Sequence, residues 1–146
     1  MILPDLNLLL YAYDLRAAQH AAAARWWRDC LSRDETVVLL AAVAFGFVRL
    51  ITGKVFASRF TPAEAGDAVR AWLQRPQVQL CDVTPRTLDI AMGLLETLGT
   101  AGNLVTDVQI AAVALETGAV VHTADTDFAR IPGVRWYNPI LGTRGR

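Results

Sequence analysis

Three short acidic segments carry the residues whose types and spacing could do chemistry. Asp5 follows an apolar start, Asp107 opens an apolar stretch that ends at Gly118, and Asp125 follows the apolar run 119–123. Carboxylates that converge repel one another and raise each other's pKa. A hard cation such as Mg²⁺ or Mn²⁺ relieves this repulsion, because it prefers oxygen ligands. The three acids therefore predict a Mg²⁺ or Mn²⁺ site if the fold brings them together.

Two uncharged residues lie beside these acids. Asn7 stands two residues after Asp5 and is placed to orient it, since groups that bond a metal ligand fix its position. Thr123 stands two residues before Asp125, where its hydroxyl could bond an acid or a ligand water. As a β-branched residue, Thr123 is equally well explained as an ordinary strand residue.

Each acid also has a purely structural explanation. Asp107 would complement the positive end of a helix dipole. Asp5 with Asn7, and Asp125 with Asp127, would form turns in which a side chain accepts a backbone N–H two residues on. Each role is common when taken alone. Three acidic segments at such positions, taken together, favour the metal site.

Strands that alternate with helices must position these residues. Apolar and β-branched runs predict strands over 2–4, 37–40, 78–83, 119–123 and 134–137, and amphipathic or apolar stretches predict helices over 7–13, 20–31, 44–51, 61–74, 84–98 and 106–117. This alternation is typical of an α/β domain whose mainly parallel sheet is covered on both faces. Ligands of such sheets bind at the carboxyl ends of the strands. Asp5 and Asp125 would emerge there together if their two strands are neighbours.

Local signals refine two of these segments and the chain end. A capping box with Pro62 at the first helical position starts the helix over 61–74. The apolar face of the helix over 84–98 is predicted to carry Leu88, Met92, Leu95 and Leu98. Residues 142–146 are expected to fray. No linker or repeat divides the chain, so residues 1–146 are predicted to form a single domain.

Composition sets the class of protein. Hydrophobic residues make up 53% and charged residues 19% of the 146, which excludes a disordered chain. The longest apolar run, 37–48, has twelve residues and is shorter than the roughly 18 of a membrane span. No basic region precedes the apolar start, so a secretory signal is not expected. We expect a cytoplasmic protein with no membrane partner.

Charge does not identify the partner. The formal net charge is zero, and only Lys54 of the 14 basic residues is lysine. The arginine guanidinium binds phosphate and carboxylate groups through two parallel hydrogen bonds, which lysine cannot do. The balance therefore neither supports nor excludes nucleic acid.

The order of the sequence blocks identifies a family. Residues 5–9 (DLNLL), 46–52 (GFVRLIT), 102–112 with Asp107, 122–130 (HTADTDFAR), 132–136 (PGVRW) and 138–139 (NP) occur in this order. The chain resembles the PIN-domain ribonucleases, and in particular the VapC toxins of bacterial toxin–antitoxin pairs. The resemblance runs nearly from end to end, and although an isolated Asp-x-Asn is a weak signal, these blocks in this order are a strong one.

The resemblance implies a three-layer α/β/α domain with a mainly parallel sheet of four to five strands. It implies the toxin of a type II toxin–antitoxin system, a divalent-metal-dependent endoribonuclease that hydrolyses RNA phosphodiester bonds to arrest growth. The implied partners are RNA, a VapB-like antitoxin that offers Arg or Lys to the acid pocket, and a second copy of the chain. The apolar helices around Trp26, Phe45 and Trp72 are expected to supply the surface of this homodimer.

The family's metal acids carry over as Asp5 and Asp107, with Asp125 as a further member that holds the ion directly or through water, and Asp127 beside the pocket. One position departs from the family pattern, because Gly46 stands where these nucleases usually carry Glu. Glu96 and Asp127 are the candidates to compensate for it. The departure puts a second firmly held metal in doubt.

Two other functions compete with the nuclease. A phosphohydrolase would use Asp5 as a nucleophile, but it needs an acid where this chain has Asn7 and a lysine that Lys54 hardly supplies. A non-catalytic module with an acidic pocket would bind a basic peptide or a metal, and Gly46 is the feature that favours it.

Overall fold

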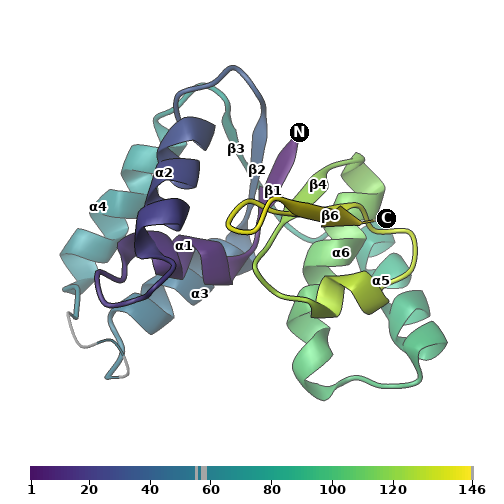
Figure 1. Cartoon of the computed structure of the whole chain (residues 1–146). Coiled ribbons are helices and arrows are strands. Elements are labelled where there is room, and N and C mark those ends of the chain that lie inside the picture. Colours follow the sequence, from purple (N-terminus) through teal and green to yellow (C-terminus); the bar gives the residue numbers. More distant parts are fainter. Residues whose placement is uncertain (55, 57–58, 146) are drawn as a thin grey trace.

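The computed structural model describes residues 1–54, 56 and 59–145, and it shows one central sheet between two layers of helices (Figure 1). The strands are β1 (Ile2–Pro4), β2 (Val37–Leu40), β3 (Val78–Cys81), β4 (Val120–His122), β5 (Trp136–Asn138) and β6 (Thr143–Gly145). The helices are α1 (Leu6–Tyr13), α2 (His20–Cys30), α3 (Ala41–Ile51), α4 (Pro62–Leu73), α5 (Pro85–Leu98) and α6 (Val105–Thr117), with 3-10 turns η1 (Gly102–Leu104) and η2 (Asp127–Arg130). The three-layer α/β/α prediction is confirmed.

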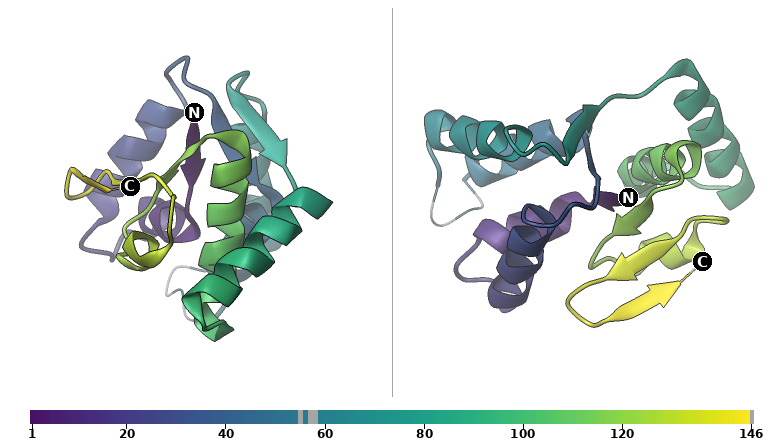
Figure 2. Two further views of the ribbon diagram at one scale, coloured as in Figure 1. Left: turned by 90° about the vertical axis from the view of Figure 1, so that its right-hand side faces the viewer. Right: turned by 90° about the horizontal axis from the view of Figure 1, so that it is seen from above.

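The sheet has the order β3-β2-β1-β4-β5-β6, in which the first five strands are parallel and β6 is antiparallel to β5. Helices α1 to α4 lie on one side of the sheet, and α5 and α6 lie on the other (Figure 2). The chain changes sides after β3 and returns to pair β4 with β1. The boundary between β1 and β4 is therefore the switch point of the sheet, where open α/β folds bind their ligands.

The C-terminal end of the sheet differs from the prediction. The sheet has six strands instead of four to five. Thr143–Gly145 forms β6, so the fraying expected over 142–146 is wrong for these three residues, and Arg146 lies outside the described residues. A turn makes this strand possible: the Asn138 side chain accepts the N–H groups of Ile140 and Leu141 at 2.9 and 3.2 Å, and Gly142 has a φ of 69°. The absence of a side chain on Gly145 leaves room for the Trp136 indole.

Helix α5 buries only part of the apolar face predicted for it. Thr87, Ala91 and Leu94 are buried and the predicted Leu95 and Leu98 pack against the core, whereas the predicted Leu88 and Met92 remain 52% and 44% exposed. Both sets have helical spacing, so the apolar pattern alone could not separate them. Glu116 of α6 decides the register, because it accepts hydrogen bonds from the hydroxyls of Thr84 and Thr87 at the start of α5.

The side of the sheet that holds α1 to α4 contains an aromatic core. The Trp72 indole N–H donates to the Tyr13 hydroxyl at 2.9 Å, and the Phe47 ring lies 4.7 Å from Trp72. Trp26 and Trp72 are 8% and 1% exposed, so they fill this chain's own core and cannot supply a dimer surface. Phe45 is 76% exposed and remains available for one.

The helices are short, and local sequence signals fix their ends. The capping box predicted at Thr61 and Glu64 is present at the start of α4. Gly99 and Gly118 end α5 and α6 in the left-handed conformation, with φ of 65° and 73°. Within the described ranges, no helix has both the length and the apolar character needed to cross a membrane.

Candidate metal centre

The acids predicted from the sequence meet at the switch point of the sheet. β1 pairs with β4 in a register that places Pro4 opposite His122, and the backbone N–H of Asp5 donates to the His122 carbonyl at 2.8 Å. Asp5 leaves β1 at the same edge where Asp125 follows β4. The expectation that these two strands are neighbours is therefore confirmed.

Three carboxylates form the tightest group at this edge. Asp107, Asp125 and Asp127 each offer one oxygen, and these oxygens lie within 4.8 Å of one another. All three residues are partly exposed. Asp107 is the third residue of α6 and its side chain makes no hydrogen bond to the described part of the chain. Oxygen atoms at this spacing on accessible side chains can share one hard cation.

Asp5 stands behind this group and is held differently. Its side chain is only 5% exposed. One carboxylate oxygen accepts the N–H of Leu6 at 2.6 Å and so caps helix α1, and the other accepts the Thr123 hydroxyl at 2.7 Å. The sequence suggested a turn with Asn7 as the structural role of Asp5, and the role observed is the cap of α1. It does not exclude a role in the site, because the pKa of Asp107 responds to the charge of Asp5.

Thr123 is the centre of a small hydrogen-bond network. Its hydroxyl donates to Asp5 and accepts from the Asn7 amide at 3.3 Å and from the backbone N–H of Asp125 at 2.8 Å. The Asn7 side chain also accepts the N–H of Ala124 at 3.2 Å. Asn7 thus acts on Asp5 through Thr123, and the same hydroxyl ties the ends of β1 and β4 together.

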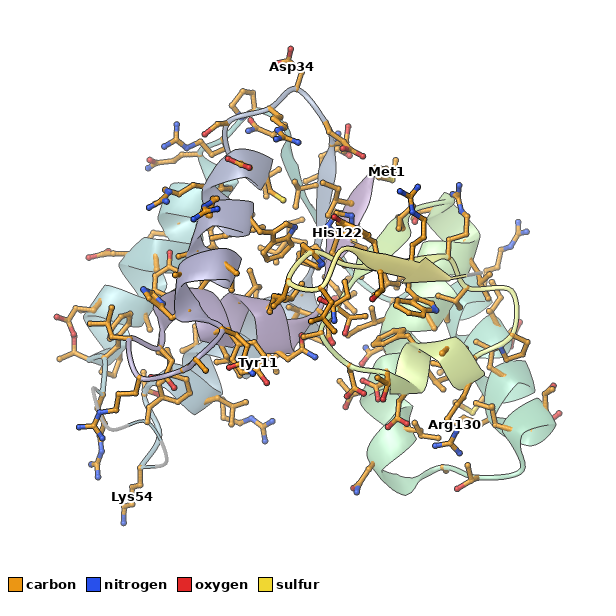
Figure 3. All side chains as sticks on the ribbon, viewed as in Figure 1. Met1, Tyr11, Asp34, Lys54, His122 and Arg130 are labelled. Carbon is orange, nitrogen blue, oxygen red and sulfur yellow. The ribbon has the colours of Figure 1, made fainter. Side chains whose placement is uncertain are left out.

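The loop after β4 presents Asp125 and Asp127 together. The backbone N–H of Asp127 donates to the Asp125 carboxylate at 2.9 Å, which is the turn expected from the sequence. Arg130, at the end of η2 (Figure 3), forms an ion pair with Asp127 at 3.2 Å. Sequence reasoning did not single out Arg130, although its place three residues after an acid is a spacing at which helical side chains meet.

Burial and mutual repulsion shift the acids toward their protonated forms. Burial raises the pKa of Asp5 to about 6, against the lowering effect of its bonds to Thr123 and Leu6, and the charge of Asp125 raises it further. Burial, followed by the charges of Asp5, Asp125 and Asp127, raises the pKa of Asp107 to about 7. A cation among these carboxylates would remove the repulsion.

Gly46 of α3 faces Leu6, the residue that follows Asp5. A Cβ on Gly46 would lie 2.9 Å from a terminal methyl group of Leu6. Glu96 is exposed on α5 and does not belong to the group, whereas Asp127 does.

The donor set fits Mg²⁺ or Mn²⁺. It consists of carboxylate oxygens, with no histidine or cysteine in the group of three. Harder divalent cations take such ligands and keep several waters. The arrangement can hold a cation at the boundary of β1 and β4, on side chains that are partly exposed.

Comparisons with known proteins identify the family to which the chain is similar. The model of the PIN domain matches residues 2–134. Ribonuclease VapC33 of Mycobacterium tuberculosis is 45% identical over 141 residues, which cover 96% of this chain and 99% of that protein. Ribonuclease VapC37 of the same species is 37% identical over 140 residues, with 95% and 97% covered.

Solved structures share the fold at low sequence identity. Mycobacterium tuberculosis VapC20, a sarcin-ricin-loop-cleaving toxin, superposes with a TM-score of 0.69 at 20% identity and covers 89% of this chain and 94% of its own. VapBC2 from Rickettsia felis, bound to a DNA fragment from its promoter, gives 0.69 at 19% identity, with 94% and 98% covered.

Proposed function

This chain belongs to the PIN-domain family and, within it, to the VapC ribonucleases, and from this premise we propose that it is a toxin that cuts RNA with the help of a divalent cation. The observation that supports the cation most strongly is the group of three carboxylates at the boundary of β1 and β4. The proposed ion is Mg²⁺, or Mn²⁺ in its place. The reaction is hydrolysis of an RNA phosphodiester bond.

Asp107, Asp125 and Asp127 would hold the ion, directly or through water. When bound, the ion supplies a Lewis acid for the scissile phosphate and lowers the pKa of a bound water. Asp107 starts a helix and brings the most freely placed of the three carboxylates. The Asp127 carboxylate is shared with Arg130, whose guanidinium can turn from it to a phosphate oxygen.

Asp5 would act from the inner side of the site. Its negative charge lies close enough to raise the pKa of Asp107, so it adds to the attraction for a cation. Thr123 fixes the Asp5 carboxylate and, through its contact with the Asp125 backbone, fixes the outer loop as well. Asn7 holds Thr123 in place. The two uncharged residues would thus position the acids instead of meeting the ion.

A phosphohydrolase that uses Asp5 as a nucleophile fits the geometry less well. Both oxygens of Asp5 already accept hydrogen bonds, and the side chain is 5% exposed. An attacking carboxylate needs a free oxygen that faces the substrate. Turnover of a simple phosphate monoester would favour this alternative.

Asp107→Asn tests the proposal. The variant keeps the shape of the side chain and removes its charge, so RNA cleavage in Mg²⁺ should fall at least about 100-fold, or about 2.7 kcal/mol in the barrier. Cleavage of a labelled RNA is measured across a Mg²⁺ titration and in EDTA. Circular dichroism checks that the fold is unchanged.

Asp89→Asn is the matched control, because Asp89 is exposed on α5 and is not part of the acidic group. It should cleave like the parent protein. Full cleavage by Asp107→Asn, or cleavage in EDTA by the parent protein, would contradict a metal site at these carboxylates. If Asp107→Asn loses all RNA cleavage but its expression still arrests growth, the non-catalytic module is favoured.

The proposed partners follow from the same relatives. VapBC complexes are among the structures that share this fold, and we propose a VapB-like antitoxin whose Arg or Lys side chain enters the acidic group. RNA is the proposed substrate, and the cytoplasm is the proposed place of action. Co-expression with the antitoxin should restore growth, and an antitoxin that lacks the basic residue should not.

A homodimer is proposed through α3 and α5 in place of the tryptophan helices. Phe45 is 76% exposed on α3, and Leu88 and Met92 are exposed on α5. Isolated exposure is common, but Leu88 and Met92 are four residues apart and share one face of α5, and a shared apolar face that stays exposed indicates an interface. Phe45→Glu should lower the mass measured by sedimentation, whereas Leu141→Glu, at a site 71% exposed on the β5–β6 turn, should not.

A further inference from the structure

A second recess lies on the side of the sheet that carries α2. It consists of two neighbouring cavities of about 390 and 420 Å³, each within the range of about 300–1,000 Å³ seen for ligand sites. Glu35, His122 and Tyr137 line both cavities, so the two form one groove. Its walls are α2 on one side and the β5–β6 hairpin on the other, with His122 between them (Figure 3).

The floor of the groove carries a fixed hydrogen-bond donor. The Trp26 indole N–H donates to Nδ1 of His122 at 2.9 Å. An indole nitrogen can only donate, so Nδ1 is the acceptor and the neutral ring carries its proton on Nε2. Burial lowers the pKa of His122 to about 4, so the ring is neutral at pH 7. Nε2 has no partner among the described residues and is left for a ligand acceptor.

An aromatic face accompanies this donor. The Tyr137 ring lies 5.1 Å from the His122 ring and at 68° to it. Trp136, the residue before Tyr137, lines the second cavity. A ring that enters the groove would therefore meet aromatic side chains beside an N–H donor. Nucleobases combine a flat ring with acceptor atoms at its edge.

The walls carry an excess of arginine. Arg25 and Arg33 line the first cavity, and Arg135 and Arg144 line the second. The two acids of the groove are already paired within the chain, since Asp29 meets Arg33 at 3.4 Å and Glu35 meets the N-terminal amine at 2.8 Å.

Only Arg33 of these four arginines is paired with an acid; Arg135 donates to the Gly118 carbonyl, and the other two have no partner among the described residues. Arg25 and Arg144 are exposed and form no ion pair with any described residue. They stand on opposite walls, on α2 and on β6. This arrangement favours phosphate groups as ligands.

We propose that this groove binds a single-stranded segment of RNA next to the cleaved bond, with phosphates on Arg25 and Arg144 and a base on Tyr137 and the Nε2–H of His122. The proposal rests on the proposed function, since it assigns a second contact to the same substrate. The groove and the acidic group share a segment of chain: His122 lines the groove, and Thr123, the next residue, bonds Asp5.

The binding test uses the Asp107→Asn protein, so that RNA is not consumed. Fluorescence anisotropy measures the affinity for a labelled single-stranded oligoribonucleotide over a range of salt concentrations. Adding Arg25→Ala and Arg144→Ala should weaken binding at least about tenfold. The plot of log K against log salt should become shallower by roughly 1.4, because each lost phosphate contact on a single strand contributes about 0.7.

The matched control is Arg28→Ala with Arg86→Ala. It removes the same charge from exposed positions of α2 and α5 that line neither cavity, and binding should stay within about twofold. Tyr137→Leu should weaken binding at least about fivefold through lost stacking, with an unchanged salt slope. If the two double arginine variants lose RNA affinity equally, or if neither loses affinity, the proposed groove is wrong. Competition by a polyglutamate peptide as strong as that by RNA would also contradict it.

A second readout separates this proposal from the metal site. In the protein with intact Asp107, the Arg25→Ala and Arg144→Ala changes should raise KM for RNA and leave kcat unchanged. A lowered kcat with unchanged KM would overturn the groove. If Asp107→Asn still cleaves RNA while the arginine variants lose affinity, the metal site fails and the groove stands.

Discussion

The inner and outer halves of the acidic site are built on opposite principles. Asp5, on the inner side, is buried and has hydrogen-bond donors on both carboxylate oxygens. Asp107, on the outer side, is half-buried, has no such donor in the described chain, and lies among like charges. The inner half is organised by the fold before any ligand arrives. The outer half is held in an arrangement of like charges whose repulsion a cation would relieve.

This difference shows what each half contributes. A carboxylate fixed by two donors sets the geometry, because its position does not depend on the ion. A carboxylate among like charges contributes affinity, because its repulsion is relieved on binding. Stability in the absence of metal should therefore distinguish the halves more clearly than activity does.

The largest effect is expected from removing the inner acid. Asp5→Ala leaves the Leu6 N–H and the Thr123 hydroxyl without an acceptor and removes the cap of α1, so it should destabilise the metal-free protein by about 1–3 kcal/mol. Asp107→Ala should leave stability unchanged or raise it. Denaturant unfolding at pH 7.5 in EDTA measures both. An equal loss of unfolding free energy in Asp5→Ala and Asp107→Ala would contradict the difference between the inner and outer halves.

Removing the link between the halves should have the next largest effect. Thr123→Val keeps the shape of the residue but takes the donor from Asp5 and the acceptor from the Asp125 N–H. Mg²⁺ affinity should fall about 10- to 100-fold, as for other groups that orient metal ligands. Thr123→Ser keeps the hydroxyl and should bind the ion nearly as the parent does, which calorimetry can measure.

A smaller effect is expected from pH. The pKa values of Asp5 and Asp107 are raised from 3.8 to about 6 and about 7, so between pH 3.8 and 7 the folded protein binds more protons than the unfolded chain. These groups stabilise the fold fully below pH 3.8, and this contribution is lost as pH rises through their folded values. Metal-free protein should therefore melt at a higher temperature at pH 5.5 than at pH 8.

The Asp107→Asn protein tests that assignment. Its gain in melting temperature between pH 8 and pH 5.5 should be smaller than that of the parent, because the group with the larger pKa shift no longer titrates. The same gain in both proteins would assign the effect to other groups. Saturating Mg²⁺ should also reduce the gain in the parent protein, since the ion competes with protons for the carboxylates.

The smallest effect is expected at Gly46. Gly46→Ala would bring a Cβ to 2.9 Å from a methyl of Leu6, whose flexible end can move away. The gain of about 1 kcal/mol in helix propensity should offset this displacement. Unfolding free energy should change by less than about 1 kcal/mol and cleavage should persist. Loss of cleavage would show that Leu6 must stay in place for Asp5 to work.

The sequence was sufficient for the elements and for the place of the acids. β-branched runs and capping signals locate β1, β2, α4 and α5, and strand-end positions locate Asp5 and Asp125, because these signals are local. The grouping of the carboxylates depends on contacts between distant parts of the chain. Asp127 joins Asp107 and Asp125, and Asp5 lies behind them, because of the way the loop after β4 meets α6. The sequence contains no local signal for this arrangement.

Two other predictions were wrong in part because the deciding contact lies elsewhere in the chain. Hydrogen bonds to Glu116 hold the start of α5, where Thr87 is buried and Leu88 is exposed, and the helical apolar pattern does not contain this contact. The residues 143–145 form a strand because the Trp136 indole packs over Gly145. The Asn138 and Gly142 turn was the available signal for β6, and an Asn–Pro pair followed by Gly is typical of a turn.

The hydrogen bond between Thr123 and Asp5 has a consequence for synthesis of the protein. Its partners are 118 positions apart in the sequence. The hydrogen bond can form only after the intervening chain has brought the two residues together. A nascent chain that has not yet released β4 therefore carries Asp5 without its donor and without Asp125 and Asp127. The acidic group is therefore incomplete on the ribosome until Thr123 and the loop that follows it have been translated.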